Sequence, residues 1–284
     1  MTGQEREDKV DRTPNPGANP DASLPSSVRV LPIVADAPLL PGMATNCYLI
    51  STGTGTLVVD PPSGREEALD SIQAAAQEGI EGVLITHTHR DHVGGLGGLV
   101  ERKQVPVYAH PKARQHLPEG IEFREVREGK DIAGWQVFYT PGHRADSVTF
   151  YSRGSGCAIV GDLVAGFGTV VISPPDGDLG DYLDSLRRLR DEIRPTLLAP
   201  GHGPLIDEPE ILLSYYINHR LTRERLVIDA LSETPRSLQT LLPNVYADTD
   251  PSLYPLAKHS LLAHLLKLQR EGRARETEEG WILE

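Results

Sequence analysis

Short apolar runs separated by turn-forming residues dominate the chain from residue 28 onwards. These runs are rich in β-branched side chains and are bounded by glycine, proline or polar residues, which is typical of β-strands. The predicted strands of the first half are residues 28–34, 47–50, 56–60, 82–87 and 105–110. Helical periodicity marks residues 65–77, and glycines lead a second helix at 94–103. This alternation indicates helices packed against a sheet.

The same order of elements returns in the second half of the chain. Strands are predicted at residues 135–143, 147–152, 157–162 and 196–202, with a helix at 179–193 before the last of them. Two similar halves predict an α/β fold of the αββα sandwich type, spanning residues 28–206.

The two ends of the chain differ from this pattern. Residues 1–27 are rich in proline, asparagine, glycine and charge, so we expect a disordered tail there. Helices are predicted at residues 209–233, 237–242 and 252–271, followed by a hairpin at 273–284. Helices followed by a hairpin resemble a winged-helix arrangement, so residues 207–284 are predicted to form a small, helical C-terminal domain.

Composition narrows the class of protein. The chain has 284 residues with 40 acidic and 28 basic side chains, and its formal net charge of −12 disfavours indiscriminate nucleic-acid binding. No apolar run is long enough for a membrane helix, and the start has no apolar segment of a signal peptide, so we expect a cytoplasmic protein without membrane contact. Cys47 and Cys157 lie in apolar strands and are predicted to be core residues.

Histidines gather where a predicted strand ends. In the sequence THTHRDHVGG, His87 and His89 alternate along an extended segment, about 7 Å apart. Asp91 and His92 follow at the turn into the next helix. Imidazole nitrogens and carboxylate oxygens are the ligands of zinc and similar divalent ions, so this loop predicts a metal site.

Three further strand ends carry the same kinds of side chain. TPGH ends in His143, IVGD ends in Asp162, and APGH ends in His202. Each is a plausible turn by itself, but a metal site needs donors from distant parts of the chain, and these three supply them.

The HxHxDH arrangement of residues 87–92 resembles the signature of the metallo-β-lactamase superfamily. The resemblance implies two divalent metal ions, taken as zinc, with a bridging hydroxide as nucleophile, and hence a hydrolase. One ion is expected among His87, His89 and His143, the other among Asp91, His92 and His202, with Asp162 between them. Asp91 is also the candidate catalytic residue. Asp60 is a candidate to orient a ligand histidine, with a turn carboxylate as the alternative, and Asn46 resembles the family's position beside the site.

The C-terminal segments 215–231 and 253–274 resemble the beta-lactamase-like protein 2 subfamily. This resemblance implies two alternative substrates, the phosphodiesters of single-stranded RNA or acyl thioesters, the latter in the manner of glyoxalase II or carrier-protein thioesterases. Iron-dependent sulfur dioxygenation is a third alternative. In a fourth, non-enzymatic alternative, the hydrolase core is vestigial and the C-terminal domain is the active part.

Charge near the C-terminus bears on the choice of substrate. Residues 258–275 contain five basic residues and one acidic residue, and three more arginines lie at 220, 223 and 225. Such a surface fits a phosphate backbone, although cations at a helix end also complement its dipole. His219 and His259 are candidate substrate contacts, with core packing as the alternative. Residues 252–271 fit a homodimer interface as well as RNA, and the extra prolines and glycines of residues 166–186 are expected to reshape the mouth of the site.

Overall fold

Two β-sheets form the centre of the molecule in a computed structural model that describes residues 13–35 and 43–284. The first sheet has the order β1-β2-β3-β4-β5-β6. Its strands are β1 (Val28–Val34), β2 (Ala44–Ser51), β3 (Thr56–Val59), β4 (Ile80–Leu84), β5 (Val107–Ala109) and β6 (Phe123–Glu125). The second sheet has the order β11-β10-β9-β8-β7. Its strands are β7 (Asp131–Ile132), β8 (Trp135–Tyr139), β9 (Val148–Ser152), β10 (Cys157–Gly161) and β11 (Leu197–Pro200).

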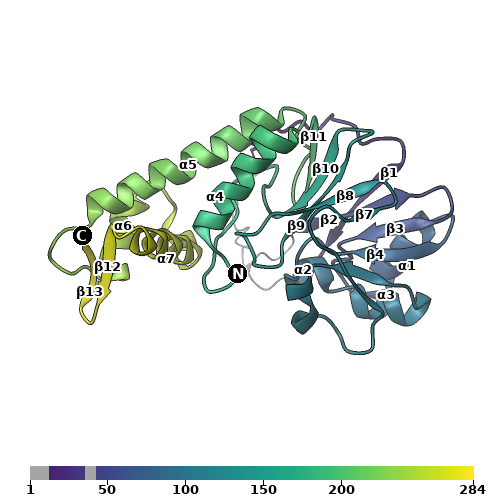
Figure 1. Ribbon diagram of the computed structural model, residues 1–284, viewed down its shortest axis with the longest axis horizontal. Helices are drawn as coiled ribbons and strands as arrows, with labels where there is room; N and C mark the ends of the chain where they lie inside the picture. The colour runs from purple at the N-terminus through teal and green to yellow at the C-terminus, as the bar shows by residue number, and fades with distance from the viewer. Residues whose placement is uncertain (1–12, 36–42) are drawn as a thin grey trace, which may run out of the picture.

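Three apolar layers hold these sheets and their helices together. The inner faces of the two sheets share one core, which includes Tyr48, Trp135 and Phe150. On the outer face of the first sheet pack α1 (Glu66–Ala75) and α3 (Leu96–Lys103). On the outer face of the second pack α4 (Leu179–Arg188), its π-helical continuation η2 (Leu189–Ile193) and the start of α5 (Pro209–Ala230). The predicted αββα sandwich is therefore confirmed, and Figure 1 shows its layers.

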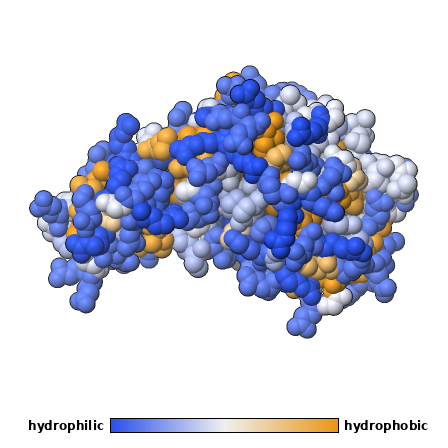
Figure 2. All heavy atoms as spheres, viewed as in Figure 1, coloured by the Kyte–Doolittle hydropathy of each residue, from blue (hydrophilic) through white to orange (hydrophobic). Residues whose placement is uncertain are grey.

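The C-terminal part forms a separate apolar core around the buried Trp281. It contains α6 (Leu238–Val245), η3 (Pro251–Leu253), α7 (Tyr254–Arg270) and the hairpin of β12 (Ala274–Thr277) and β13 (Gly280–Leu283). Helices followed by a hairpin are the winged-helix arrangement that the sequence predicted. On the face in Figure 2, hydrophobic residues are scattered among hydrophilic ones over both lobes.

Helix α5 belongs to both lobes and connects them (Figure 1). Its first turns place Leu212 and Tyr216 in the core against α4, and its last turns place Val227 in the core of the C-terminal part. A domain boundary at residue 207 stays a prediction, because this single helix passes from one core to the other. Among the helices of the described residues, none has the length and hydropathy that a membrane span requires.

The N-terminal region departs from the disorder predicted for residues 1–27. Residues 1–12 lie outside the described residues, but residues 13–27 pack against the sandwich. The buried Asn15 donates from Nδ2 to the carbonyls of Ala165 (2.9 Å) and Gly168 (2.8 Å), and Ala18 forms a bridge with Ile206. Composition alone suggested disorder, because these few long-range polar contacts leave no periodic pattern in the sequence.

Strand direction gathers the polar strand ends at one edge of the sandwich. In the first sheet β3 and β4 are parallel, and in the second β10 and β11 are parallel. Strand β8 runs in the direction of β10, because each is antiparallel to β9 between them. The loops that follow β3, β4, β8, β10 and β11 therefore emerge together, and these are the loops that carry the predicted ligands.

Candidate metal centre

Seven acidic and histidine residues meet at this edge in two groups. In each group, one nitrogen or oxygen atom per residue lies within 4.8 Å of those of the others. The first group is His87, His89, His143 and Asp162, and the second is Asp91, His92 and His202. Neither group is local in sequence, and each takes residues from loops of both sheets.

Three imidazoles of the first group converge on a small volume. The Nδ1 atom of His89 lies 3.1 Å from Nε2 of His87 and 2.9 Å from Nε2 of His143. Carboxylate oxygen Oδ2 of Asp162 lies 3.6 Å from Nε2 of His143 and 3.9 Å from that of His87. Three nitrogens and one oxygen aimed at one point are a donor set that suits a zinc-like divalent cation.

Asp162 also reaches the second group. Its Oδ1 lies 3.3 Å from Nε2 of His92, and its Oδ2 lies 3.5 Å from Nε2 of His202. That same nitrogen of His202 lies 3.3 Å from Oδ2 of Asp91. The carboxylate of Asp162 therefore stands between the two groups, where the resemblance placed it.

Hydrogen bonds on the far side of the rings fix three of the imidazoles. Nδ1 of His143 donates to the carbonyl of Val171 (3.0 Å), and Nδ1 of His202 donates to that of Ala44 (2.9 Å). Nδ1 of His92 donates to Oδ2 of Asp60 (2.9 Å). When the ring is neutral, a proton on Nδ1 leaves the lone pair of Nε2 directed into the centre, which is the tautomer a metal requires.

Asp60 binds the residue that links the end of β4 to His87. It accepts hydrogen bonds from the backbone N–H of Thr86 (2.8 Å) and from its hydroxyl (2.6 Å). Since the hydroxyl proton of Thr86 points to Asp60, its oxygen accepts from Nδ1 of His87, which lies 3.1 Å away. The buried carboxylate thus orients both His87 and His92, which agrees with the orienting role considered for it and not with a plain turn residue.

Asn46 acts on the turn that carries His202. Its Nδ2 donates to the carbonyls of Pro200 (3.0 Å) and Gly203 (2.9 Å), one on each side of the histidine. The residue lies beside the centre without offering it a donor atom of its own.

Two features of the site itself fit a bound cation. Nε2 of His92 and Oδ1 of Asp162 are buried, and neither has a hydrogen-bond partner among the described residues. Buried polar atoms are rarely left unpaired, so a ligand at this point accounts for both. Gly201 keeps the space open, because a Cβ there would lie 2.3 Å from Oδ1 of Asp162.

Burial and charge separate the pKa values of the two groups. Burial lowers the pKa of His143 to about 3, so this ring is neutral and ready to coordinate. Burial also disfavours a charged His202, but the carboxylates of Asp162 and Asp91 outweigh it and raise the pKa of His202 to about 10. Burial raises the pKa of Asp91, whereas its hydrogen bond to His202 and the charge of His92 bring it down to about 2. The carboxylates are therefore ionised near neutral pH.

Sequence reasoning missed a buried arginine beside the centre. Arg144 follows His143, donates from Nε to the hydroxyl of Thr88 (3.1 Å), and pairs with Asp146 (3.2 Å) and Asp176 (3.0 Å). Through Thr88 and Asp176 it connects the histidine motif after β4 with the loop after residue 166. Its position directly after TPGH was the only signal, and any exposed arginine would have given the same one.

The two remaining candidate histidines lie outside the two groups. His219 is half-buried on α5 and stacks on Tyr215, with ring centroids 6.2 Å apart. It has no hydrogen bond or ring contact with the seven residues within the described part of the chain. His259 on α7 is exposed, and its Nδ1 lies 3.0 Å from Oγ of Ser173. His259 therefore contacts the segment that follows Val171, the residue whose carbonyl binds His143.

The predicted basic surface is largely neutralised by acidic partners. Arg223 pairs with Asp248, Arg270 with Asp178, and Arg275 with Glu284. Lys267 and Arg273 both pair with Glu224 and Glu271. Most of these cations are therefore paired with acidic residues, and some of the partners, such as Asp178 for Arg270 and Asp248 for Arg223, lie too far away in the sequence to be predicted.

Comparison with known proteins agrees with this site. Residues 40–202 match the family described as the metallo-beta-lactamase superfamily, and residues 237–281 match the beta-lactamase associated winged helix domain. The chain therefore belongs to the metallo-beta-lactamase superfamily and carries the winged helix domain associated with it.

Relatives of known sequence extend over most of the chain. It is 34% identical over 242 residues to the beta-lactamase-like protein 2 homolog of Caenorhabditis elegans, covering 80% of this chain and 79% of that one. It is 31% identical over 272 residues to the Drosophila melanogaster homolog, covering 88% and 90%. An atrochrysone carboxyl ACP thioesterase of Aspergillus fumigatus is 31% identical over 207 residues, covering 69% and 62%.

Solved structures confirm the fold. A metallo-beta-lactamase family protein of Thermus thermophilus superposes with a TM-score of 0.76 at 21% identity, covering 92% of this chain and 100% of that one. A protein crystallised in a di-iron-bound form gives a TM-score of 0.52 at 31% identity, covering 62% and 93%.

Proposed function

We propose that this protein is a dinuclear metal-dependent hydrolase of acyl thioesters. The observation that carries the proposal is the pair of donor groups joined by Asp162, since two cations sharing one carboxylate form a site for hydrolysis. The choice of thioester rests on the thioesterase of Aspergillus fumigatus among its relatives and on the neutralised charge of the C-terminal domain.

The residues present fit two divalent cations, proposed as zinc. His87, His89 and His143 would hold one ion, Asp91, His92 and His202 the other, and Asp162 both. Metal coordination would supply the acidity that makes a bound water a hydroxide near neutral pH and would polarise a carbonyl oxygen. Imidazole and carboxylate donors also suit iron, and a relative of this fold was solved with two iron ions, so metal identity is part of the test.

The chain's own residues prepare this chemistry. Asp60, Val171 and Ala44 hold the histidine rings so that their free nitrogens face inward. Asp91 is ionised and only partly buried, so it is the proposed catalytic residue that orients the attacking water.

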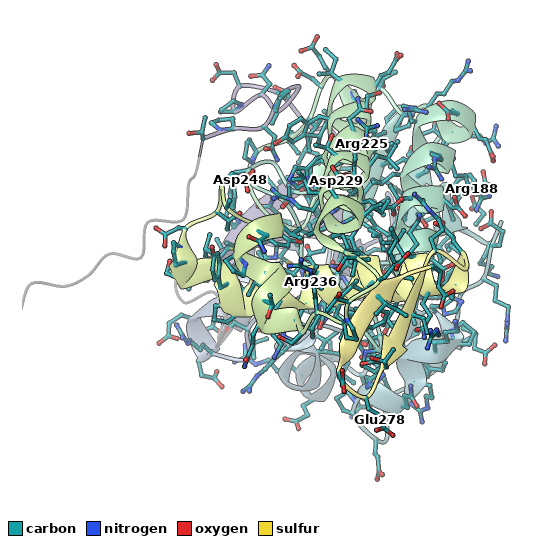
Figure 3. All side chains as sticks on the ribbon, turned by 90° about the vertical axis from the view of Figure 1, so that its left-hand side faces the viewer. Arg188, Arg225, Asp229, Arg236, Asp248 and Glu278 are labelled. Atoms are coloured by element: carbon teal, nitrogen blue, oxygen red, sulfur yellow. The ribbon has the colours of Figure 1, made fainter. Side chains whose placement is uncertain are left out.

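The outer face of the C-terminal domain offers no uniform positive charge. Figure 3 labels both arginines and acidic residues on this side of the molecule, including Arg225, Asp229, Arg236, Asp248 and Glu278. A phosphate backbone would require basic side chains free of acidic partners. This arrangement favours a substrate that depends on the metal centre for recognition of its reacting carbonyl.

Single-stranded RNA is the second candidate substrate. Arg90, Arg225 and Lys258 have no ion-pair partner within residues 13–35 and 43–284, and Arg90 lies in the histidine motif itself. Separate cations such as these give weaker support to a nucleic-acid site than a continuous groove does.

A panel of substrates separates the two candidates. The zinc-loaded protein would be given acyl-coenzyme A and acyl-glutathione thioesters, with release of free thiol as the signal, and in parallel a labelled single-stranded RNA. We expect thiol release, and we expect Asp91→Asn to reduce it at least 100-fold, whereas Asp70→Asn on the exposed face of α1 leaves it unchanged.

The other outcomes are equally informative. RNA cleavage that disappears in Asp91→Asn, without any thioester turnover, would replace the first candidate by the second. RNA cleavage that survives Asp91→Asn would indicate a contaminating nuclease.

A further inference from the structure

The segment of residues 163–171 links the two ends of the metal centre. It begins directly after Asp162, and it ends at Val171, whose carbonyl accepts the proton of His143 Nδ1. It has no helix or strand, yet Leu163, Val164 and Val170 are buried. A few backbone hydrogen bonds, from Gly166 to His202 and from Asn15 to Gly166, hold its middle, and side chains that bind its carbonyl groups hold the rest.

Three side chains from α4 and α5 bind these carbonyls. The hydroxyl of Tyr182 donates to Leu163 (2.8 Å), and the hydroxyl of Tyr216 donates to Gly168 (3.0 Å). Nη2 of Arg220 donates to Val170, the residue before the partner of His143. The helical layer is thereby connected to both ends of the segment.

Arg220 is an unusual member of this set because it is a buried charge. It is 3% exposed, and within the described part of the chain no carboxylate lies at ion-pair distance from it. Its Nε has no hydrogen-bond partner there, and its guanidinium lies 5.4 Å from the ring centre of Tyr182. Arg223, one turn further along α5, has Asp248 as its acidic partner.

A buried cation without a carboxylate costs stability. A methionine of similar size would fill the same volume without that penalty, so packing alone does not explain an arginine here. What methionine cannot supply is the hydrogen bond to the carbonyl of Val170 and the cation–π contact with Tyr182.

Helix α7 of the C-terminal domain binds the residues that follow this segment, Ser173 and Asp178. Oγ of Ser173 lies 3.0 Å from Nδ1 of His259, and Asp178 pairs with Arg270 of α7 (2.6 Å). The backbone N–H of Asp178 donates to the carbonyl of Gly142, the residue before His143. Side chains of α5 and α7 therefore bind residues 170–178. The same stretch also binds residues 142 and 143, through the backbone N–H of Asp178 and the carbonyl of Val171.

We propose that Arg220 is a positioning residue of the metal centre, which fixes the carbonyl of Val171 through Val170 and thereby the imidazole of His143. Loss of Arg220 would then weaken one metal position more than the other. His143, a ligand of the first position only, takes the partner of its Nδ1 from this segment, whereas the rings of His92 and His202 take theirs from Asp60 and Ala44.

Metal affinity tests this role without reference to any substrate. Metal-free protein would be titrated with zinc in competition with a chromophoric chelator, and the two binding steps resolved. We expect Arg220→Met to weaken one step about 10- to 100-fold and to leave the other within about threefold of the wild type. Arg220→Lys keeps a donor and the charge, so it should recover part of the lost affinity.

Two controls keep the result interpretable. Arg187→Met removes an exposed arginine of α4 whose one ion-pair partner among the described residues is Asp184, and both steps should remain as in the wild type. Tyr216→Phe removes only the hydroxyl that binds the same segment, so it should weaken the same binding step. It provides the test if Arg220→Met fails to fold.

Equal affinities in the wild type, Arg220→Met and Tyr216→Phe would overturn the positioning role while leaving the proposed hydrolase intact. Absence of any zinc binding by the wild-type protein would overturn both.

Discussion

Replacement of Asp60 by asparagine tests how far the centre depends on a residue that offers no donor atom to it. Asp60 is 2% exposed and accepts three hydrogen bonds, two from Thr86 and one from His92. Its φ of 52° lies in the left-handed region, which asparagine tolerates better than other side chains of this size. Asp60→Asn therefore changes the hydrogen bonding without adding backbone strain, as Asp60→Ala would.

The size of the effect follows from the three donors. An amide placed with its NH₂ at the position of Oδ2 faces both the hydroxyl of Thr86 and Nδ1–H of His92, so the favoured orientation keeps the oxygen there. The NH₂ then faces the backbone N–H of Thr86, and one buried hydrogen bond is lost. We expect the free energy of unfolding of the metal-free protein to fall by about 1–3 kcal/mol. Because His92 also loses a charged partner, zinc affinity should fall about 10- to 100-fold.

Urea unfolding of the metal-free protein and chelator competition measure the two effects separately. Asp70→Asn is the matched control, because Asp70 is an exposed carboxylate that pairs with Arg102. It should change the unfolding free energy by less than about 1 kcal/mol. Wild-type zinc affinity in Asp60→Asn would refute the reasoning, since it would mean that Asp60 has no influence on the ligand histidines.

Three further changes probe other parts of the structure. Gly201→Ala would bring a Cβ to 2.3 Å from Oδ1 of Asp162, so metal retained after dialysis, counted by elemental analysis, should fall well below two ions per chain. Removal of metal by a chelator should lower the melting temperature by roughly 5–10 °C in a thermal scan, because ligands that bind only the folded state stabilise it by mass action. Trp281→Ala would empty the centre of the C-terminal core and should lower the free energy of unfolding by about 3–5 kcal/mol in urea, and an unchanged value would contradict the burial of this ring.

The residues of the two donor groups could be predicted from the sequence because they lie at strand ends. Apolar residues precede these ligands, at 83–85 around the end of β4 and at 157–160 in β10, so the polar residues that follow, including His87 and Asp162, mark the edge of the sheet. Parallel strands then bring these edges together regardless of their distance along the chain. The same logic identified Asp60 at the end of β3.

The groups that orient these ligands could not be predicted in this way. The carbonyls of Val171 and Ala44 fix two histidines, but every residue has a carbonyl, and nothing in the sequence distinguishes these two. Ion pairs between distant residues are equally hidden, as with Arg270 and Asp178, which are 92 positions apart. The count of basic residues near the C-terminus was correct, but it contained no information on their partners.

The division of ligands between the sheets has a consequence for stability. His87 and His89 follow β4 of the first sheet, whereas His143 and Asp162 follow β8 and β10 of the second. In the second group Asp91 and His92 come from the first sheet and His202 from the second. Each cation would therefore join the two sheets, and a protein without metal would hold them together by their shared apolar core and by hydrogen bonds such as those from Asn46 to Pro200 and Gly203. Any change that separates the sheets should weaken both metal positions, whereas loss of the hydrogen bond from Arg220 to Val170 should weaken mainly the position that contains His143.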